Sequence, residues 1–217
     1  MQKKQTAILI SGRGSNMSVL LKAAQAPDFP AQISLVVSNR ADAVGLSIAE
    51  AAGVRTLVLN HKEFRDRIAF DAALDAHLRV EGIEIICLAG FMRLMTPWLV
   101  ERWRDRMINV HPSLLPSFKG LDTHARALAA GVRFHGCTVH LVRAEMDEGP
   151  MLLQAVVPVL PGDTPESLAA RVLEQEHVIY PAGLALLAGG RCKVDDDRVV
   201  IRGMDVPRTI LVSPIVP

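Results

Sequence analysis

The sequence predicts an α/β fold: an open, mostly parallel sheet with helices on both faces, continued by antiparallel strands and a long C-terminal helix. Short β-rich runs alternate with longer helical patterns over the first 110 of the 217 residues. Several of these runs are continuously apolar, which is typical of parallel strands that are covered on both faces. Strand, helix and strand repeated in this way indicate right-handed βαβ units within one sheet.

The first part of the chain carries the expected parallel strands and the helices between them. The strands are expected at Thr6–Ile10, Ile33–Ser38, Thr56–Leu59, Ile83–Leu88 and Arg106–Val110. The helices are expected at Ser15–Ala26, Asp42–Ala52, Lys62–Val80 and Thr96–Trp103. Ser15 or Asn16 is a candidate N-cap of the first helix, and Gly53 and Gly82 stand where helix C-terminal glycines belong.

After residue 111 the pattern changes. A helix is expected at Leu121–Ala130, followed by two strands, Thr138–Val142 and Leu152–Val159, which a tight acidic turn joins. A long helix is expected at Thr164–Leu187, with a threonine cap and a proline at its first position. Pro181 within it is expected to kink or end the helix. A last strand is expected at Arg198–Ile201, and an apolar, proline-rich tail follows at Thr209–Pro217.

Composition excludes several classes of protein. The net charge is +1, from 24 basic and 23 acidic residues, so an extended nucleic-acid or membrane surface is not expected. Cys87, Cys137 and Cys192 are far apart and odd in number, which suits neither a zinc site nor a disulfide framework. The N-terminus lacks signal-peptide features, and no uncharged run reaches the ~20 residues of a membrane span. We therefore expect a cytoplasmic protein with small-molecule partners and no metal, either a monomer or a homodimer.

The segment after the first expected strand is rich in glycine and leads directly into a helix. It reads SGRGSN at residues 11–16. A helix N-terminus exposes backbone N–H groups and the positive end of the helix dipole, so this turn is a candidate anion site. Met17 stands where the dinucleotide fingerprint requires its third glycine, and no Lys-Ser/Thr pair completes a Walker A loop. The alternative is a well-capped tight turn without a ligand.

A second group of polar residues follows the fifth expected strand. Asn109 and His111 alternate along that strand and therefore lie on the same face. A carboxamide can bind a developing oxyanion and an imidazole can move a proton, which suits acyl transfer. Asp147, in the later acidic turn, is a candidate to orient and charge His111. The alternatives are a polar strand end and a solvated turn. His135 and His140 are expected on opposite faces of a strand and are poor joint metal ligands.

Seven segments, taken together and in order, resemble the folate-dependent formyltransferases, and among them the phosphoribosylglycinamide (GAR) formyltransferases. The most specific is NVHPSLLP, which begins at Asn109. The segments are ISGRGSN (10–16), SNRADAVGL (38–46), LAGFMRLM (88–95), NVHPSLLPSFKGLDTHARAL (109–128), HGCTVHLV (135–142), DEGPMLLQAVVPV (147–159) and EQEHVIYP (174–181). The resemblance covers residues 6–190, and the last residues match nothing that can be carried over.

The resemblance implies transfer of the formyl group of the co-substrate 10-formyltetrahydrofolate to the amine of GAR. It implies three catalytic residues: Asn109, His111 and Asp147. The GAR-binding residues that it implies are Gly14, Ser15, Asn16 and Glu176. The folate-binding residues that it implies are Arg67, Met92, Arg93, Leu94, Met95, Asn109, Arg143, Ala144, Glu145, Met146 and Asp147.

The same resemblance implies one formyltransferase domain over residues 1–217. Within it we expect a phosphate-binding, Rossmann-like half (1–110), a folate and catalytic half (111–190) and a C-terminal tail (191–217). The transfer-RNA formyltransferases are the nearest alternative, but they carry a separate nucleic-acid-binding domain. Formyltetrahydrofolate hydrolases carry an N-terminal regulatory domain, for which there is no room before Thr6. A nucleotide-binding oxidoreductase would require the missing third glycine.

Overall fold

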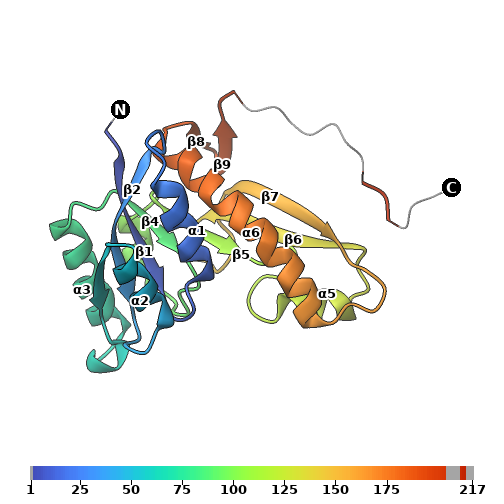
Figure 1. Ribbon diagram of the computed structural model, residues 1–217, viewed down its shortest axis with the longest axis horizontal. Helices are drawn as coiled ribbons and strands as arrows, with labels where there is room; N and C mark the ends of the chain where they lie inside the picture. The colour runs from blue at the N-terminus through green and yellow to red at the C-terminus, as the bar shows by residue number, and fades with distance from the viewer. Residues whose placement is uncertain (1, 204–210, 214–217) are drawn as a thin grey trace.

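Seven strands form a single sheet in the order β3-β2-β1-β4-β5-β6-β7, seen in the computed structural model in Figure 1. The structure describes residues 2–203 and 211–213. The first five strands are parallel, and β6 and β7 continue the sheet in antiparallel fashion. The strands are β1 (Lys4–Ile10), β2 (Ala31–Ser38), β3 (Arg55–Val58), β4 (Ile85–Leu88), β5 (Met107–His111), β6 (Phe134–Leu141) and β7 (Met151–Pro158). The predicted fold class is confirmed.

Helices cover both faces of this sheet. They are α1 (Ser15–Ala24), α2 (Val44–Ala51), α3 (Arg67–Val80), α4 (Pro97–Arg102), α5 (Thr123–Ala129) and α6 (Pro165–Ala188). Buried residues of α1, α2 and α6 share one core with the sheet, and those of α3 and α4 form a second core on its other face. Figure 1 shows α1 and α6 side by side in front of the sheet. Among the described residues, no helix has the length and apolar character needed to cross a bilayer.

The first strand shows why a continuously apolar run is needed. Ile8 and Ile10 face the core beneath α1 and α6, whereas Ala7 and Leu9 face the core beneath α3. All four are fully buried. Because successive side chains of a strand point to opposite faces, a strand covered on both sides must be apolar at every position.

The long helix α6 crosses from one half of the molecule to the other. It begins at a capping box in which the Thr164 and Ser167 side chains each bind the other's backbone N–H group. Pro181 lies inside the helix, which continues to Ala188. The helix therefore does not end at Pro181, and it reaches the end expected near Leu187. Tyr180 and Leu184 on either side of it are fully buried, so packing holds both halves of the helix in place.

Three details differ from the sequence-based expectations. The N-cap of α1 is Gly14 and not Ser15 or Asn16, and no side chain of the described residues caps this helix. The helix expected at Lys62–Val80 is divided: a short 3-10 turn at His61–Glu63 precedes α3, which Asp66 caps through the N–H of Ala69. The last expected strand, β9 (Arg198–Ile201), pairs with a strand that was not expected, β8 (Cys192–Asp195). Most of the expected tail Thr209–Pro217 lies outside the described residues.

Gly136 allows β6 and β7 to approach closely. A Cβ atom at this position would lie 1.9 Å from the Ala155 oxygen and 2.9 Å from Leu114 Cδ2. Backbone atoms on the neighbouring strand cannot move aside without breaking the ladder. Position 136 therefore requires glycine for reasons of space.

We expect Gly136→Ala to lower the free energy of unfolding by about 1–3 kcal/mol or more, the usual cost of overpacking. Urea unfolding followed by circular dichroism measures this change. Gly12→Ala is the control, because a Cβ at Gly12 meets nothing within 4 Å. Equal stabilities of the two variants would contradict the steric explanation.

Candidate active site

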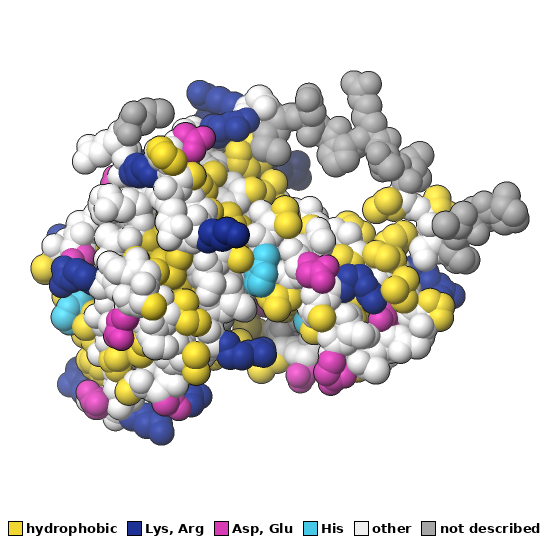
Figure 2. Space-filling model, viewed as in Figure 1, with side chains coloured by type: hydrophobic (Ala, Val, Ile, Leu, Met, Phe, Trp, Pro, Cys, Tyr) yellow, Lys and Arg dark blue, Asp and Glu magenta, His cyan; other side chains and the backbone are white. Residues whose placement is uncertain are grey.

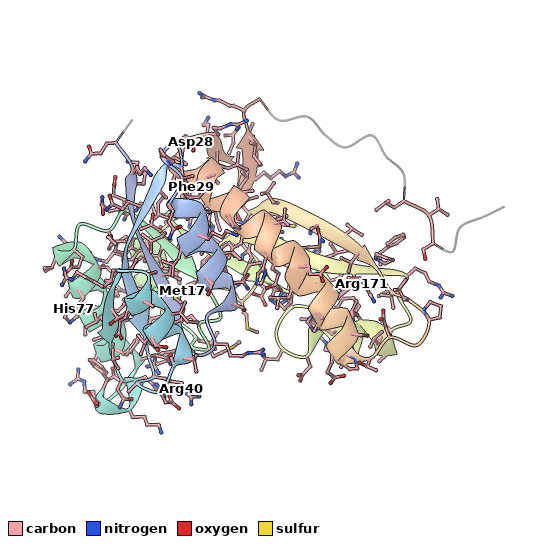
Figure 3. The ribbon with its side chains drawn as sticks, in the orientation of Figure 1. Met17, Asp28, Phe29, Arg40, His77 and Arg171 are labelled. Atoms are coloured by element: carbon pink, nitrogen blue, oxygen red, sulfur yellow. The ribbon has the colours of Figure 1, made fainter. Side chains whose placement is uncertain are left out.

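A cavity of about 480 Å³ opens at the carboxyl ends of β1, β2 and β4. Ligands of open α/β sheets usually bind at the carboxyl edge of the strands, where the direction of the strand order reverses. Here that point lies between β1 and β4. Arg13, Arg40, His61 and Arg93 contribute to its wall, and none of the described residues that line it is a carboxylate. Arg40, which follows β2 and is labelled in Figure 3, is paired with Asp42 at 2.6 Å. Figure 2 shows a hollow between the two halves of the molecule, with basic side chains at its lower edge. The cavity favours an anion.

The glycine-rich segment forms one wall of this cavity. Gly14 has a φ of 78°, in the left-handed region that favours glycine. A Cβ atom there would lie 3.0 Å from the Gly45 Cα atom and 3.0 Å from Met17 Cε, so α2 and the buried face of α1 also exclude a side chain. With no side-chain cap on α1 in the described structure, the first backbone N–H groups of the helix stay free to bind a ligand.

Asn16 and Glu176, 160 residues apart in sequence, meet beside the segment. The Asn16 Nδ2 group donates a hydrogen bond of 2.6 Å to Glu176 Oε2. Glu176 is only 7% exposed, and burial raises the pKa of its carboxyl group although the Asn16 hydrogen bond acts in the opposite direction. The Asn16 Oδ1 atom is buried and has no hydrogen-bond partner within the described structure. The structure thus brings together two of the predicted acceptor-binding residues.

The predicted catalytic residues also lie together, one strand away from the cavity. Asn109 pairs with Leu88 of β4, and the cavity-lining residue Ala89 follows directly. His111 Nδ1 lies 3.4 Å from Asp147 Oδ2, and both side chains are more than nine-tenths buried. Asp147 adopts a φ of 58° and accepts a hydrogen bond of 2.8 Å from the Gly120 N–H group, which joins the two loops that carry the site.

Both ring nitrogens of His111 face oxygen atoms. Its Nδ1 atom faces the Asp147 carboxylate, and its Nε2 atom donates a 3.1 Å hydrogen bond to the Phe118 carbonyl oxygen. These two groups fix the orientation of the imidazole ring. The sequence did not indicate the role of the Phe118 carbonyl, because a backbone group leaves no residue-type signal.

His140 is a site residue that the sequence-based analysis did not identify. Its Nδ1–H group donates to the Leu141 oxygen at 3.0 Å, which leaves Nε2 as an acceptor for Asn109 Nδ2 at 3.2 Å. Burial lowers the pKa of His140, which keeps this acceptor unprotonated. His140 therefore orients the Asn109 carboxamide. His140 pairs directly with Asn109 across β5 and β6. This pairing could be predicted only from a known register of the two strands.

Two further histidines, the buried His135 and the partly buried His124, support the loop that follows β5. His135 packs edge-on against the Phe118 and His124 rings, at centroid distances of 5.7 and 5.4 Å. Burial lowers the pKa of His135 to about 4 and also lowers the pKa of His124. Neutral imidazoles at these positions fill space beneath Phe118, whose carbonyl group holds His111. Within the described ranges, no group of three or more potential metal-ligating side chains comes together.

Most of the predicted donor-binding residues lie in two loops, 92–95 and 143–147, whereas Arg67 begins α3 and Asn109 lies in β5. Met92, Leu94 and Met146 are 73%, 59% and 54% exposed, an unusual state for large apolar side chains. Met95 is partly buried, and Arg67, Ala144 and Glu145 are exposed. The Arg93 guanidinium stacks on the Phe70 ring at 4.4 Å.

Arg143 differs from the other predicted donor-binding residues, because its side chain has other partners. It donates to Asp105 at 2.7 Å and to Asp197 at 3.1 Å, so the guanidinium group connects the catalytic loop with the β8–β9 hairpin. The backbone of the segment and the side chain of Met146 remain available to a ligand.

The comparisons with known proteins agree on one family. The formyl transferase family model matches residues 4–184. The chain is 39% identical to the phosphoribosylglycinamide formyltransferase of Haemophilus influenzae over 206 residues, which is 95% of this chain and 97% of that protein. It is 45% identical to a solved structure, glycinamide ribonucleotide transformylase 1 from Symbiobacterium toebii, with a TM-score of 0.89 and coverage of 92% of this chain and 94% of that one.

Larger relatives match over a part of their length. The chain is 46% identical to the human trifunctional purine biosynthetic protein adenosine-3 over 196 residues. The match covers 90% of this chain and 19% of that protein, so the chain spans about a fifth of the length of this relative.

The buried carboxyl group of Glu176 leads to a test of pH dependence. Because burial raises its pKa in the folded state, the folded protein holds this proton more tightly than the unfolded chain does. Stability is therefore lost as the pH rises from the ordinary value of 4.5 through the raised folded pKa. Glu176→Gln removes this titration, and its amide oxygen can still accept from Asn16.

We expect Glu176→Gln to match the parent protein in stability below pH 4.5 and to be the more stable of the two at neutral pH. Urea midpoints measured at a series of pH values provide the comparison. A variant that is less stable than the parent throughout the series would show that the ionised carboxylate stabilises the fold.

Proposed function

We propose, because the chain belongs to the formyl transferase family, that it transfers the formyl group of 10-formyltetrahydrofolate to the amine of GAR in purine biosynthesis. The products are formyl-GAR and tetrahydrofolate. The observation that carries this proposal is the cluster of Asn109, His111 and Asp147, which lies directly beside a cavity suited to a phosphate.

The acceptor phosphate binds at the N-terminus of α1. The N–H groups of Gly14, Ser15 and Asn16 meet it, and Arg13 adds positive charge to the same cavity, whereas Arg40 is paired with Asp42. Glu176, held by Asn16, provides a buried acceptor for a hydroxyl or amine group of the acceptor molecule. This arrangement directs the reactive end of the acceptor toward β5, because Asn109 lies one strand beyond the cavity.

The folate donor supplies the activated formyl group when it is bound. The chemistry of the residues fits a flat, partly apolar molecule with an anionic tail. The exposed side chains of Met92, Leu94 and Met146 offer apolar contacts, and Arg67 is exposed and available to a carboxylate. The backbone of residues 143–147 adds hydrogen-bonding groups next to Asp147.

The chemical step forms a bond between the acceptor nitrogen and the formyl carbon, and breaks the bond from that carbon to the folate nitrogen. Negative charge develops on the formyl oxygen, and preorganised donors stabilise such a charge. Asn109 Nδ2 has a second N–H group that His140 does not use. The His111 imidazolium exchanges the Phe118 carbonyl for the same oxygen, and Asp147 keeps His111 charged. The proton that the amine loses passes through a water near this cluster to the departing nitrogen.

A formyltetrahydrofolate hydrolase is the alternative function, with water as acceptor. Such an enzyme has no need for a phosphate site. The arginine-lined cavity at the N-terminus of α1 therefore favours transfer to a phosphate-bearing amine. A cytoplasmic location also forms part of the proposal, because Cys87, Cys137 and Cys192 are free thiols, as expected in a reducing compartment.

We expect the purified protein to release tetrahydrofolate from 10-formyltetrahydrofolate only when GAR is present, and to do so in EDTA. Absorbance of the folate measures turnover directly. Inorganic phosphate should compete with GAR and leave the donor KM nearly unchanged. Equal rates with and without GAR would establish the hydrolase, and loss of turnover in EDTA would establish a metal requirement.

We expect Asp147→Asn to lower kcat by about 10²–10⁴-fold, the usual scale for loss of acid–base function. The reason is that the neutral amide of this variant cannot balance the positive charge of the His111 imidazolium. Asn109→Ala should cost about 10²–10³-fold through the lost oxyanion donor. Steady-state kinetics of the single variants and the double variant measure both effects.

The double variant tests whether these residues act together. Groups that act as one unit give losses that are far from multiplicative. The double variant should therefore be much more active than the product of the single losses predicts. Strictly multiplicative losses, or a normal kcat in Asp147→Asn, would show that Asp147 acts only as a loop residue.

A further inference from the structure

The loop of residues 91–96, which joins β4 to α4, is held at both ends by buried side chains. At its start, the Met92 N–H group donates a 2.8 Å hydrogen bond to Ser11 Oγ. At its end, the Thr96 N–H and hydroxyl groups donate to Asp71 Oδ2 at 2.6 and 2.7 Å. Asp71 is fully buried, and Thr96 caps α4, so this second contact belongs to the start of a helix. The contact with Ser11 has no such local explanation.

Ser11 belongs to a different part of the molecule from the loop that it holds. It follows β1 directly and is the first residue of the glycine-rich segment (11–16), 81 residues before Met92. Its hydroxyl group donates a 2.6 Å hydrogen bond to Asn39 Oδ1, and Ser11 and Asn39 are 7% and 3% exposed. The Ser11 hydroxyl group therefore has a fixed orientation: its proton is directed at Asn39, and its lone pair at Met92.

The glycine-rich segment keeps its shape without this hydroxyl group. Gly45 donates its N–H group to the Gly12 oxygen at 3.0 Å, and Ser18 Oγ donates to the Gly14 oxygen at 3.0 Å. The Met92 N–H group, in contrast, has the Ser11 hydroxyl as its hydrogen-bond acceptor in the described structure. Removal of the hydroxyl would leave a partly buried N–H group without this acceptor, so the donor loop would have to move.

We propose that Ser11 is a positioning residue for the donor loop, located in the segment that binds the acceptor. The proposal rests on the proposed function, because it assigns the loop containing Met92 to the formyl donor. The proposal predicts different effects on the two substrates: one hydroxyl group next to the acceptor phosphate fixes the backbone that receives the folate. The backbone of the acceptor segment is held by other contacts, those of the Gly12 and Gly14 carbonyl oxygens.

Ser11→Ala tests this asymmetry. The donor KM should rise by about 3- to 10-fold, the scale of one lost hydrogen bond to a neutral group. The acceptor KM, and the inhibition constant of inorganic phosphate against the acceptor, should stay within about twofold of the parent values, because the segment keeps its other contacts. Ser18→Ala is the matched control: it also loses a serine hydroxyl group near Gly14, but it makes no contact with Met92, so the donor KM should not change.

Hydrogen exchange provides a measurement that does not depend on turnover. The Met92 amide should exchange faster in Ser11→Ala than in the parent protein, and at the parent rate in Ser18→Ala. A parent protein that is inactive with GAR and 10-formyltetrahydrofolate would refute the proposed function, whereas unchanged exchange at Met92 would refute the role of Ser11. If Ser11→Ala does not fold, Ser11→Cys keeps a similar volume with a weaker acceptor and should change both measurements in the same direction. An unchanged donor KM, or equal increases in both KM values, would overturn the proposal.

Discussion

The site depends on the packing of α6 across the two halves of the sheet. Tyr180 is fully buried and donates its hydroxyl proton to the Leu88 oxygen at 2.8 Å, at the point where β4 ends. One turn earlier on the same helix, Glu176 accepts from Asn16 at the start of α1. The helix thus holds the acceptor segment, the end of β4 and the neighbouring β5 in one arrangement. The proposed function needs this arrangement, because the residues proposed for phosphate binding and for formyl transfer follow different strands.

The histidines of the site show how surroundings decide the role of one residue type. His140 is buried with a carbonyl group at one nitrogen and an amide N–H at the other, so the neutral ring fits. His111 faces oxygens at both nitrogens. The two rings lie at different distances from the same carboxylate side chain, Asp147. Histidines in adjacent strands of one sheet therefore have different hydrogen-bond partners.

Much of the fold was predictable, because it follows from local rules. The apolar run of β1, the glycines at 53 and 82, and the threonine cap of α6 each act through their own backbone or nearest neighbours. The same-face pair of Asn109 and His111 followed from strand alternation alone. The acidic turn indicated Asp147, and the family resemblance added Glu176, but no local rule could place either residue beside its partner.

What the sequence did not reveal depends on long-range geometry. The contact of His140 with Asn109 requires the register of β5 and β6, and a β-bulge between Val139 and His140 interrupts the pairing with β7 at the same point. The Phe118 carbonyl and the Met92 N–H group are backbone groups, which carry no residue signature. Proline inside a helix removes one backbone hydrogen bond and often ends the helix. The helix α6 continues past Pro181 because packing on both sides of this residue outweighs the missing hydrogen bond.

The absence of carboxylates from the described wall of the main cavity also affects the rate at which ligands arrive. Positive charge in a cleft with low-dielectric walls concentrates the electric field and draws in anions before any contact is made. The net charge of the whole chain is only +1, and Arg40 is paired with Asp42 at 2.6 Å, so this attraction comes from Arg13 and Arg93. Attraction of this kind is screened over about 8 Å at physiological ionic strength. It therefore acts on anions that have already come close to the cavity.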